Sequence, residues 1–225
     1  MMNVILVIGS PRQKDSTSVA LGNYLVKQLE ATTEIEAETH YTHRALRSKT
    51  GLDGALAALA EAELVIFAAP VYVDSMPAPA IRFLERAASF LAENPARATG
   101  QRLVALTNCG FPEAQHGDVM LEICRRFAEQ TGFTWAGGLT LGAGEPLHGK
   151  PLEASGPMAR PAMEALDATA RALAQGGDVP PEADTLMRKP RIPPAVYRRM
   201  GNLLWTRQAK KRDLQGQLRA RPWQA

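Results

Sequence analysis

The sequence has few cysteines and no long apolar run. Two of its 225 residues are cysteine, Cys109 and Cys124, and they have no CxxC spacing. This pattern favours reduced thiols in the cytoplasm over a disulfide framework. No apolar run approaches the roughly 18 residues of a membrane span. The first ten residues, MMNVILVIGS, have no basic start typical of a signal peptide. We expect a cytoplasmic globular protein of one large domain or two small ones.

The usual signals of metal and hydrolytic sites are also missing. His40 and His43 are three residues apart, but no group of His and Cys residues has zinc-like spacing, so no metal site is predicted. No GxSxG sequence is present, which argues against a serine hydrolase. Nothing that flanks Cys109 would stabilise a thiolate, so we expect this side chain to pack rather than react. The residues alone therefore single out no catalytic acid, base or nucleophile.

The net positive charge of the chain comes from its C-terminal tail. Residues 186–225 contain 11 Lys or Arg and one acidic residue, Asp213, although the net charge of the whole chain is only +3. The rest of the chain therefore holds 15 basic and 22 acidic residues. The basic character belongs to the tail and says little about the ligands of the main domain.

What the sequence does contain is an alternation of apolar strands and amphipathic helices. We expect strands over residues 3–8, 34–40, 64–69, 103–107 and 133–141, and helices over residues 17–30, 52–62, 80–92, 118–130 and 157–174. Strands that alternate with helices form a parallel sheet covered on both faces, and such buried strands are apolar almost throughout. The prediction is an α/β fold with a doubly wound five-stranded parallel sheet of order 2-1-3-4-5.

Proline-rich segments mark the end of this domain. Residues 179–181 read VPP and residues 188–194 read RKPRIPP. We expect a main domain over residues 1–178, followed by a linker and a basic amphipathic helical tail over residues 179–225.

One face of the helix expected over residues 195–212 carries Val196, Met200, Leu203 and Leu204. Docking of this helix on its own domain or on a second subunit is the favoured use. Contact with an anionic membrane surface is a second use. Contact with nucleic acid is a third, but no recognition motif supports it.

The loop after the first strand has the composition of an anion site. The segment GSPRQKDSTS at residues 9–18 leads into a helix whose first backbone N–H groups lack partners within the helix. It is not a P-loop, because Lys14 and Asp15 stand where Gly and Lys are required, and only Gly9 matches a dinucleotide fingerprint. A plain strand-to-helix turn with a Ser or Thr cap is the alternative.

Two further loops follow the third and fourth strands, APVYVDSMPAPAIRFLER at residues 69–86 and TNCGFPEAQHG at residues 107–117. In a sheet of order 2-1-3-4-5, the loops after strands 1 and 3 diverge and leave a crevice where ligands bind. Tyr72 and Phe111 offer apolar faces there, and Gly110 allows close approach of the backbone. A mononucleotide with a large ring system would suit the three loops. Gly137, Gly138, Gly142 and Gly144 mark either a loop that approaches a ligand or a turn and bulge.

The segments GSPRQKDSTS at residues 9–18 and PVYVDSMPAPAIRFLER at residues 70–86, in this order and spacing, resemble the NADPH-dependent FMN reductase-like family of the flavodoxin-like fold. The resemblance covers about residues 3–175. It implies FMN as the cofactor and NADPH or NADH as the co-substrate. It also implies a quinone, flavin, nitro or azo compound as the small-molecule acceptor. Flavin sites in this fold often lie near a dimer interface, so the resemblance further implies a homo-oligomer.

The resemblance also assigns site residues. It implies that the FMN phosphate is held by Ser10, Arg12, Ser16, Thr17 and Ser18, and that the isoalloxazine ring lies against Pro70, Val71, Tyr72, Met76, Asn108, Cys109, Gly110 and Phe111. Hydride would pass from the nicotinamide to the flavin and on to the acceptor, with ping-pong kinetics and without a catalytic acid or base. An electron carrier of the same fold, and a flavin-free binding or regulatory protein, remain as alternatives.

Overall fold

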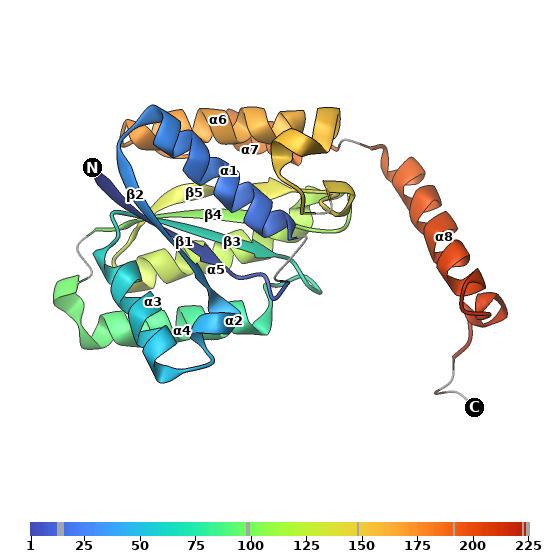
Figure 1. Cartoon of the computed structure of the whole chain (residues 1–225), viewed down its shortest axis with the longest axis horizontal. Helices are drawn as coiled ribbons and strands as arrows, with labels where there is room; N and C mark the ends of the chain where they lie inside the picture. The colour runs from blue at the N-terminus through green and yellow to red at the C-terminus, as the bar shows by residue number, and fades with distance from the viewer. Residues whose placement is uncertain (13–15, 98–99, 148, 191, 222, 224–225) are drawn as a thin grey trace.

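The structure is a computed structural model that describes residues 1–12, 16–97, 100–147, 149–190, 192–221 and 223. Its centre is a five-stranded parallel sheet of order β2-β1-β3-β4-β5 (Figure 1). The strands are β1 (Met2–Ile8), β2 (Ile35–Tyr41), β3 (Leu64–Pro70), β4 (Arg102–Asn108) and β5 (Thr134–Leu141). The predicted fold class and strand order are therefore confirmed.

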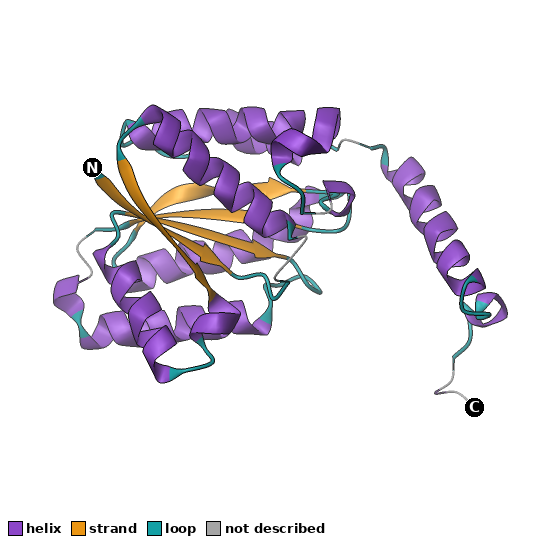
Figure 2. Cartoon of the chain, viewed as in Figure 1, coloured by secondary structure: helices purple, strands orange, loops and turns teal. Residues whose placement is uncertain are grey.

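Helices cover both faces of this sheet, as Figure 2 shows. One face carries α1 (Thr17–Thr32), α6 (Arg160–Ala174) and α7 (Pro181–Arg188); the other carries α2 (Thr42–Ala45), α3 (Lys49–Glu61), α4 (Ala78–Glu93) and α5 (Asp118–Thr131). Short 3₁₀ helices lie at Pro95–Arg97, Ala114–Gly117, Glu145–Leu147, Leu152–Ala159 and Gln215–Gln217. The short helix α2 was not predicted. The helix expected from residue 157 begins as an α-helix only at Arg160, because residues 157–159 belong to a 3₁₀ helix that is kinked at Gly156, where φ is 65°.

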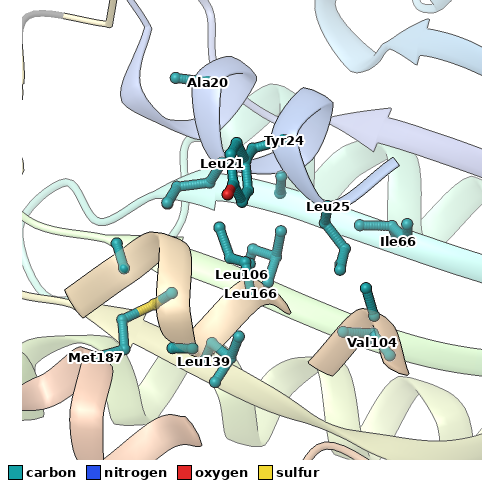
Figure 3. Packing of buried hydrophobic residues seen from close by; sticks show 14 of the residues in the cluster. Ala20, Leu21, Tyr24, Leu25, Ile66, Val104, Leu106, Leu139, Leu166 and Met187 are labelled. Atoms are coloured by element: carbon teal, nitrogen blue, oxygen red, sulfur yellow. The ribbon is translucent and has the colours of Figure 1, made fainter. Parts of the chain in front are cut away.

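The side chains of each central strand pack alternately in two separate cores. Leu6 of β1 packs toward α1 and α6, whereas Val7 packs toward α3 and α4. Figure 3 shows Leu21 and Leu25 of α1 among the side chains of the first of these cores, with Leu166 of α6 in the same cluster. Because the side chains of a strand point alternately to opposite faces, a nearly continuous apolar run is what a doubly covered strand requires.

The end of β1 is fixed by a close approach of backbone. A Cβ added to Gly9 would lie 2.7 Å from the Cβ of Ala69 and 2.9 Å from the Cβ of Ala80. The backbone N–H of Gly9 donates to the carbonyl of Ala68 at 2.8 Å. Glycine therefore lets the chain leave the sheet between β3 and α4, and this sets the start of the loop that follows.

Helix α7 is packed into the body of the protein, although the sequence analysis placed it in the tail. Its Ala183 and Met187 are buried in the core that also contains α1 and α6. Asp184 Oδ1 accepts a hydrogen bond from the backbone N–H of Thr140 in β5 at 3.1 Å. Arg188 pairs with Asp118 at the start of α5 at 2.6 Å. The boundary expected after residue 178 thus falls inside the packed body.

The last helix, α8 (Pro194–Lys210), extends away from the body (Figure 1). Its side chains are mostly exposed, and Ala209 is its one buried residue. Near its start, the Tyr197 hydroxyl donates to the carbonyl of Gly110 in the loop after β4. Most of α8 therefore does not pack on the described residues of its own domain, and docking on a second subunit stays a prediction. Within the described ranges, no helix has the length and apolarity needed to cross a bilayer.

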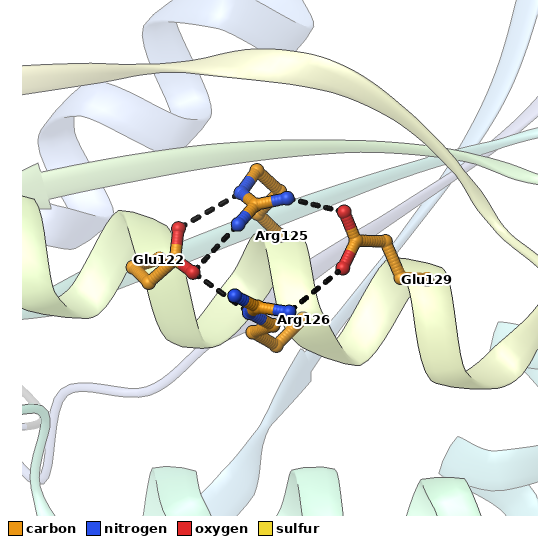
Figure 4. A network of polar contacts seen from close by, with 4 residues as sticks. All are labelled: Glu122, Arg125, Arg126 and Glu129. Carbon is orange, nitrogen blue, oxygen red and sulfur yellow. Dashed lines mark hydrogen bonds and ion pairs between the residues drawn. The ribbon is translucent and has the colours of Figure 1, made fainter.

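The outer face of α5 carries a network of ion pairs (Figure 4). Arg125 and Arg126 each pair with both Glu122 and Glu129, one turn before and one turn after them. Hydrogen bonds from the two guanidinium groups lower the pKa of Glu122 to about 2. Exposed pairs of this kind contribute little to stability because water and salt screen them. The network lies on the helix surface and forms no part of the ligand cleft.

Candidate functional site

A cleft of about 400 Å³ opens at the carboxyl ends of β1, β3 and β4. This is the place where the strand order of an open α/β sheet reverses and where ligands bind. Its walls come from the loop before α1, the loops after β3 and β4, and one residue after β5. The lining residues are Ser10, Arg12, Ser16, Thr17, Ser18, Pro70, Val71, Tyr72, Val73, Asn108, Cys109, Gly110, Phe111 and Gly144.

The amino end of α1 forms one wall of the cleft. Ser16 is the N-cap, and its Oγ accepts from the backbone N–H of Val19 at 3.5 Å. The first turn of α1 contains no acidic residue. Ser10 is buried and accepts from the backbone N–H of Arg12 at 3.3 Å. Unpaired N–H groups, the helix dipole and a guanidinium together favour an anion at this end.

Two hydroxyls in the same turn hold the walls of the cleft together. Thr17 Oγ1 donates to the carbonyl of Gly144 at 3.1 Å, and Ser18 Oγ donates to Asn108 Oδ1 at 2.7 Å. Both bonds are buried and join segments about 90 or more residues apart in the chain. These hydroxyl protons are therefore used within the protein, and the first backbone N–H groups of α1 are the donors that a helix leaves without intrahelical partners.

The loop after β3 ends in a tight hairpin at the rim of the cleft. Tyr72 and Ser75 exchange backbone hydrogen bonds across Val73 and Asp74, whose φ angles are 51° and 62°. Two positive φ values define a type I′ turn, in which a β-branched residue is strained. Val73 is nevertheless 98% exposed, so its side chain gains no packing in return. Strain of this kind is typical of functional sites.

Replacing Val73 with Asn is expected to stabilise the protein by about 1 kcal/mol, because Asn tolerates a positive φ. The melting temperature should rise by about 3 °C for a domain of this size. Differential scanning calorimetry measures the change. Val73→Thr is the matched control, since Thr is also β-branched and should show no gain. Equal melting temperatures for the two variants would contradict the assignment of strain to this backbone.

The loop after β4 forms the opposite, aromatic wall. Phe111 is 64% exposed, and its ring centroid lies 5.4 Å from that of His116. His116 Nδ1 in turn lies 3.1 Å from Asp74 Oδ1 in the hairpin. A Cβ added to Gly110 would meet no atom within 4 Å, so this backbone faces open space. The cleft thus has a polar end at the start of α1 and an apolar end at Tyr72, Val73 and Phe111.

All but one of the predicted site residues line this cleft. The exception is Met76, which is 3% exposed and packs in the core beneath α3 and α4. Two lining residues were not predicted as contacts, Val73 and Gly144. Val73 lies in the segment quoted for the second loop, and Gly144 is one of the glycines flagged as a possible ligand approach. Gly137 instead lies at a register shift opposite β4, which fits the bulge interpretation.

Both cysteines are buried and free. Burial raises the pKa of the Cys109 thiol above its usual value, and raises the pKa of Cys124 to about 12. A raised pKa leaves less thiolate at a given pH, so both thiols stay protonated at pH 8. We expect iodoacetamide at pH 8 to modify neither residue in the folded protein and both after unfolding, as measured by mass spectrometry. Rapid alkylation of Cys109 in the native state would instead indicate a reactive thiol in the cleft.

The fold and the cleft define a flavodoxin-like α/β protein with a nucleotide-sized ligand site at the switch point of its sheet. Residues 2–129 match the family described as NADPH-dependent FMN reductase. The chain belongs to this family and is an FMN-dependent NAD(P)H oxidoreductase. No curated protein matches the sequence.

Solved structures share the fold at low sequence identity. An FMN-dependent NADH-azoreductase from Bacillus anthracis in complex with FMN is 11% identical, with a TM-score of 0.55 over 76% of this chain and 99% of that chain. An NADPH-quinone reductase from P. pentosaceus is 13% identical, with a TM-score of 0.54 over 76% of this chain and 98% of that chain. The apo form of the NADH:FMN oxidoreductase EMOB is 16% identical, with a TM-score of 0.54 over 86% of this chain and 97% of that chain.

Proposed function

We propose that the cleft binds FMN, and that the protein uses NADPH to reduce a small organic acceptor in the cytoplasm. One observation carries the proposal: the amino end of α1, whose first turn contains no acidic residue, and an apolar, aromatic wall line one cleft. FMN has a phosphate at one end and a large flat ring at the other, so its two ends match the two ends of the cleft. Family membership supports the same cofactor.

The phosphate would be held mainly by backbone N–H groups in the first turn of α1, with Arg12 and the hydroxyls of Ser10 and Ser16 around it. Thr17 and Ser18 would act as positioning residues, because their hydroxyls fix the loops after β4 and β5 against the same turn. A phosphate held this way needs no lysine from a P-loop. This explains how a short loop with one leading glycine can serve as the anion site.

The ring would lie between the hairpin after β3 and the loop after β4. Pro70, Val71 and Tyr72 form one side, and Asn108, Cys109, Gly110 and Phe111 form the other. Met76 would support the hairpin from the core rather than contact the ring. When bound, FMN supplies the hydride chemistry. The protein binds and orients the reactants and excludes water from the ring, and these roles require no acid or base from a side chain.

NADPH is proposed as the donor because the family that matches residues 2–129 is described as NADPH-dependent. Because donor and acceptor would each react with the bound flavin in turn, double-reciprocal plots should give parallel lines. The ratio of kcat/KM for NADPH to that for NADH tests the preference, and a ratio of one or less would reject it.

The decisive experiment is a visible spectrum of the purified protein after incubation with FMN and gel filtration. Flavin bands that survive the column and bleach anaerobically with NADPH support a reductase. Retained flavin that no nicotinamide bleaches would indicate an electron carrier of the same fold. No retained flavin at high FMN would point to a flavin-free protein, and would reject the proposed cofactor.

The charge distribution also favours self-association. The tail over residues 186–225 is strongly basic and the rest of the chain carries a net negative charge, and most side chains of α8 are exposed. We therefore propose a homo-oligomer in which the tail of one copy meets the body of another. Light scattering on the full chain and on a chain ending at Lys189 tests this, since only the full chain should associate. The alternative, attraction to an anionic membrane, would appear as binding to phosphatidylserine vesicles without self-association.

A further inference from the structure

A second hollow, of about 510 Å³, lies between the body and helix α8. It is lined by Gly110, Phe111, Pro146, Ile192, Tyr197, Met200, Gly201, Leu204, Trp205 and Gln208. Gly110 and Phe111 also line the first cleft, so the two hollows meet at this segment. Every other residue of the second hollow lies outside residues 2–129, which match the family. Most of this hollow is therefore formed by the part of the chain that follows the family match.

The lining of this hollow is apolar and rich in aromatic rings. Phe111, Tyr197 and Trp205 offer ring faces and edges, Met200 a polarisable thioether, and Leu204 an aliphatic side chain. None of the described lining residues is charged. Flat apolar rings gain both from burial and from stacking in such surroundings. A charged ligand would lose hydration there without gaining a partner.

A hydrogen bond joins the start of α8 to the loop that borders both hollows. The Tyr197 hydroxyl donates to the carbonyl of Gly110, which pins the start of α8 to the loop that both hollows share. From this point α8 leaves the body, and Leu204 and Trp205 remain 53% and 67% exposed. Phe111 stands at the border, where its ring can face a molecule in either hollow. A ring system bound against α8 would thus have one end at the first cleft.

We propose that α8 and the loop after β4 form a binding site for the electron acceptor, which is an uncharged, flat and largely apolar ring compound. This inference rests on the proposed function, and it adds the location and the chemical class of the acceptor. In the overall reaction, the reduced nicotinamide loses a hydride. The acceptor gains that hydride and one proton from water. Helix α8 selects this class of acceptor over charged ones.

Binding can be measured without flavin or turnover. 2-Methyl-1,4-naphthoquinone should quench the fluorescence of Trp205 in the flavin-free protein, and most of this quenching should be lost in Trp205→Phe. Leu204→Asp should weaken the binding about tenfold, because it removes apolar contact and places a charge in the hollow. Leu203→Asp is the matched control: Leu203 is the neighbouring residue, is 52% exposed and does not line the hollow. Its binding constant should equal that of the unmodified protein.

Steady-state kinetics then separate this site from the common one. Leu204→Asp should raise the KM for 2-methyl-1,4-naphthoquinone about tenfold and leave the KM for ferricyanide unchanged. Bleaching of the bound flavin by NADPH should be the same in all variants. If no variant retains or bleaches flavin, the proposed function fails. The fluorescence titration still tests whether the hollow binds the naphthoquinone.

Two results would overturn the acceptor site. The first is equal naphthoquinone affinity in the Leu204→Asp and Leu203→Asp variants. The second is a Leu204→Asp variant with unchanged affinity and a lower mass in solution, because this would assign the hollow to contact with a second copy of the chain.

Discussion

Ser16→Asp is expected to lower the affinity for FMN about 100-fold without unfolding the protein. Ser16 is a buried N-cap of α1 that lines the cleft. A carboxylate at this position would lie next to the phosphate. Two like charges 4 Å apart repel by about 4 kcal/mol at an effective dielectric constant of about 20, and salt reduces this value, which leaves a loss of about two orders of magnitude. Titration of the apoprotein with FMN, followed by quenching of flavin fluorescence, gives the affinity.

The fold should survive this change, because Asp caps a helix as well as Ser does and its charge suits the helix dipole. Ser48 provides the matched control. It is the N-cap of α3, its Oγ accepts from the backbone N–H of Gly51 at 3.0 Å, and it lies outside the cleft. Ser48→Asp should leave both FMN affinity and melting temperature unchanged. An unchanged FMN affinity in Ser16→Asp would show that the phosphate is not bound at the start of α1.

The sheet was predictable because its strands are buried on both faces. A strand such as β3, buried at every residue, leaves a continuous apolar run that no solvent-exposed segment would carry. The crevice followed from the strand order, since the loops after β1 and β3 must diverge. Residues on these loops were expected at one crevice from their positions in the sequence, and the structure brings all of them except Met76 to one cleft. Ser18 and Asn108, 90 residues apart, meet in the cleft by a hydrogen bond at 2.7 Å.

Other features depended on contacts that local sequence does not encode. Met76 follows the hairpin in sequence, but the tight turn at Val73 and Asp74 directs the chain back and places Met76 in the core. Composition does not reveal that turn, because Val rarely adopts a positive φ. The hollow beside α8 was also missed, since it depends on tertiary contacts such as the hydrogen bond between Tyr197 and Gly110.

The packing of helix α7 at the expected domain boundary could not be predicted from local sequence either. The prolines before it were interpreted as a linker, whereas Pro181 is the first residue of the helix. Proline is favoured at this position because an N–H group there would have no partner within the helix. The polar residues of α7 also made its composition similar to that of the charged segment that follows it. Asp184 and Arg188 are in fact partners of the body: Arg188 donates to Asp118 at 2.6 Å and to Asp184 at 2.5 Å. Only the tertiary structure shows that these charges are paired.

A chain ending at Asp178 should therefore melt about 10 °C below the full chain, whereas a chain ending at Lys189 should melt close to it. The shorter chain loses the burial of Ala183 and Met187, which are 2% and 1% exposed, and uncovers the apolar side chains beneath them. Together with the lost contacts of Asp184 and Arg188, we expect a loss of about 4 kcal/mol, which corresponds to this temperature change for a domain of this size.

Calorimetry on the two shortened chains separates two views of the C-terminal region. If α7 belongs to the packed body, the loss of stability falls between residues 178 and 189, and removal of α8 costs little because α8 is mostly exposed. The chain ending at Lys189 should also keep its FMN affinity, since none of the described residues that line the first cleft lies beyond Gly144. Equal melting temperatures for the two shortened chains would place the domain boundary at residue 178 after all. A large loss in the longer one would mean that α8 stabilises the body, through an interface between copies that a single chain does not contain.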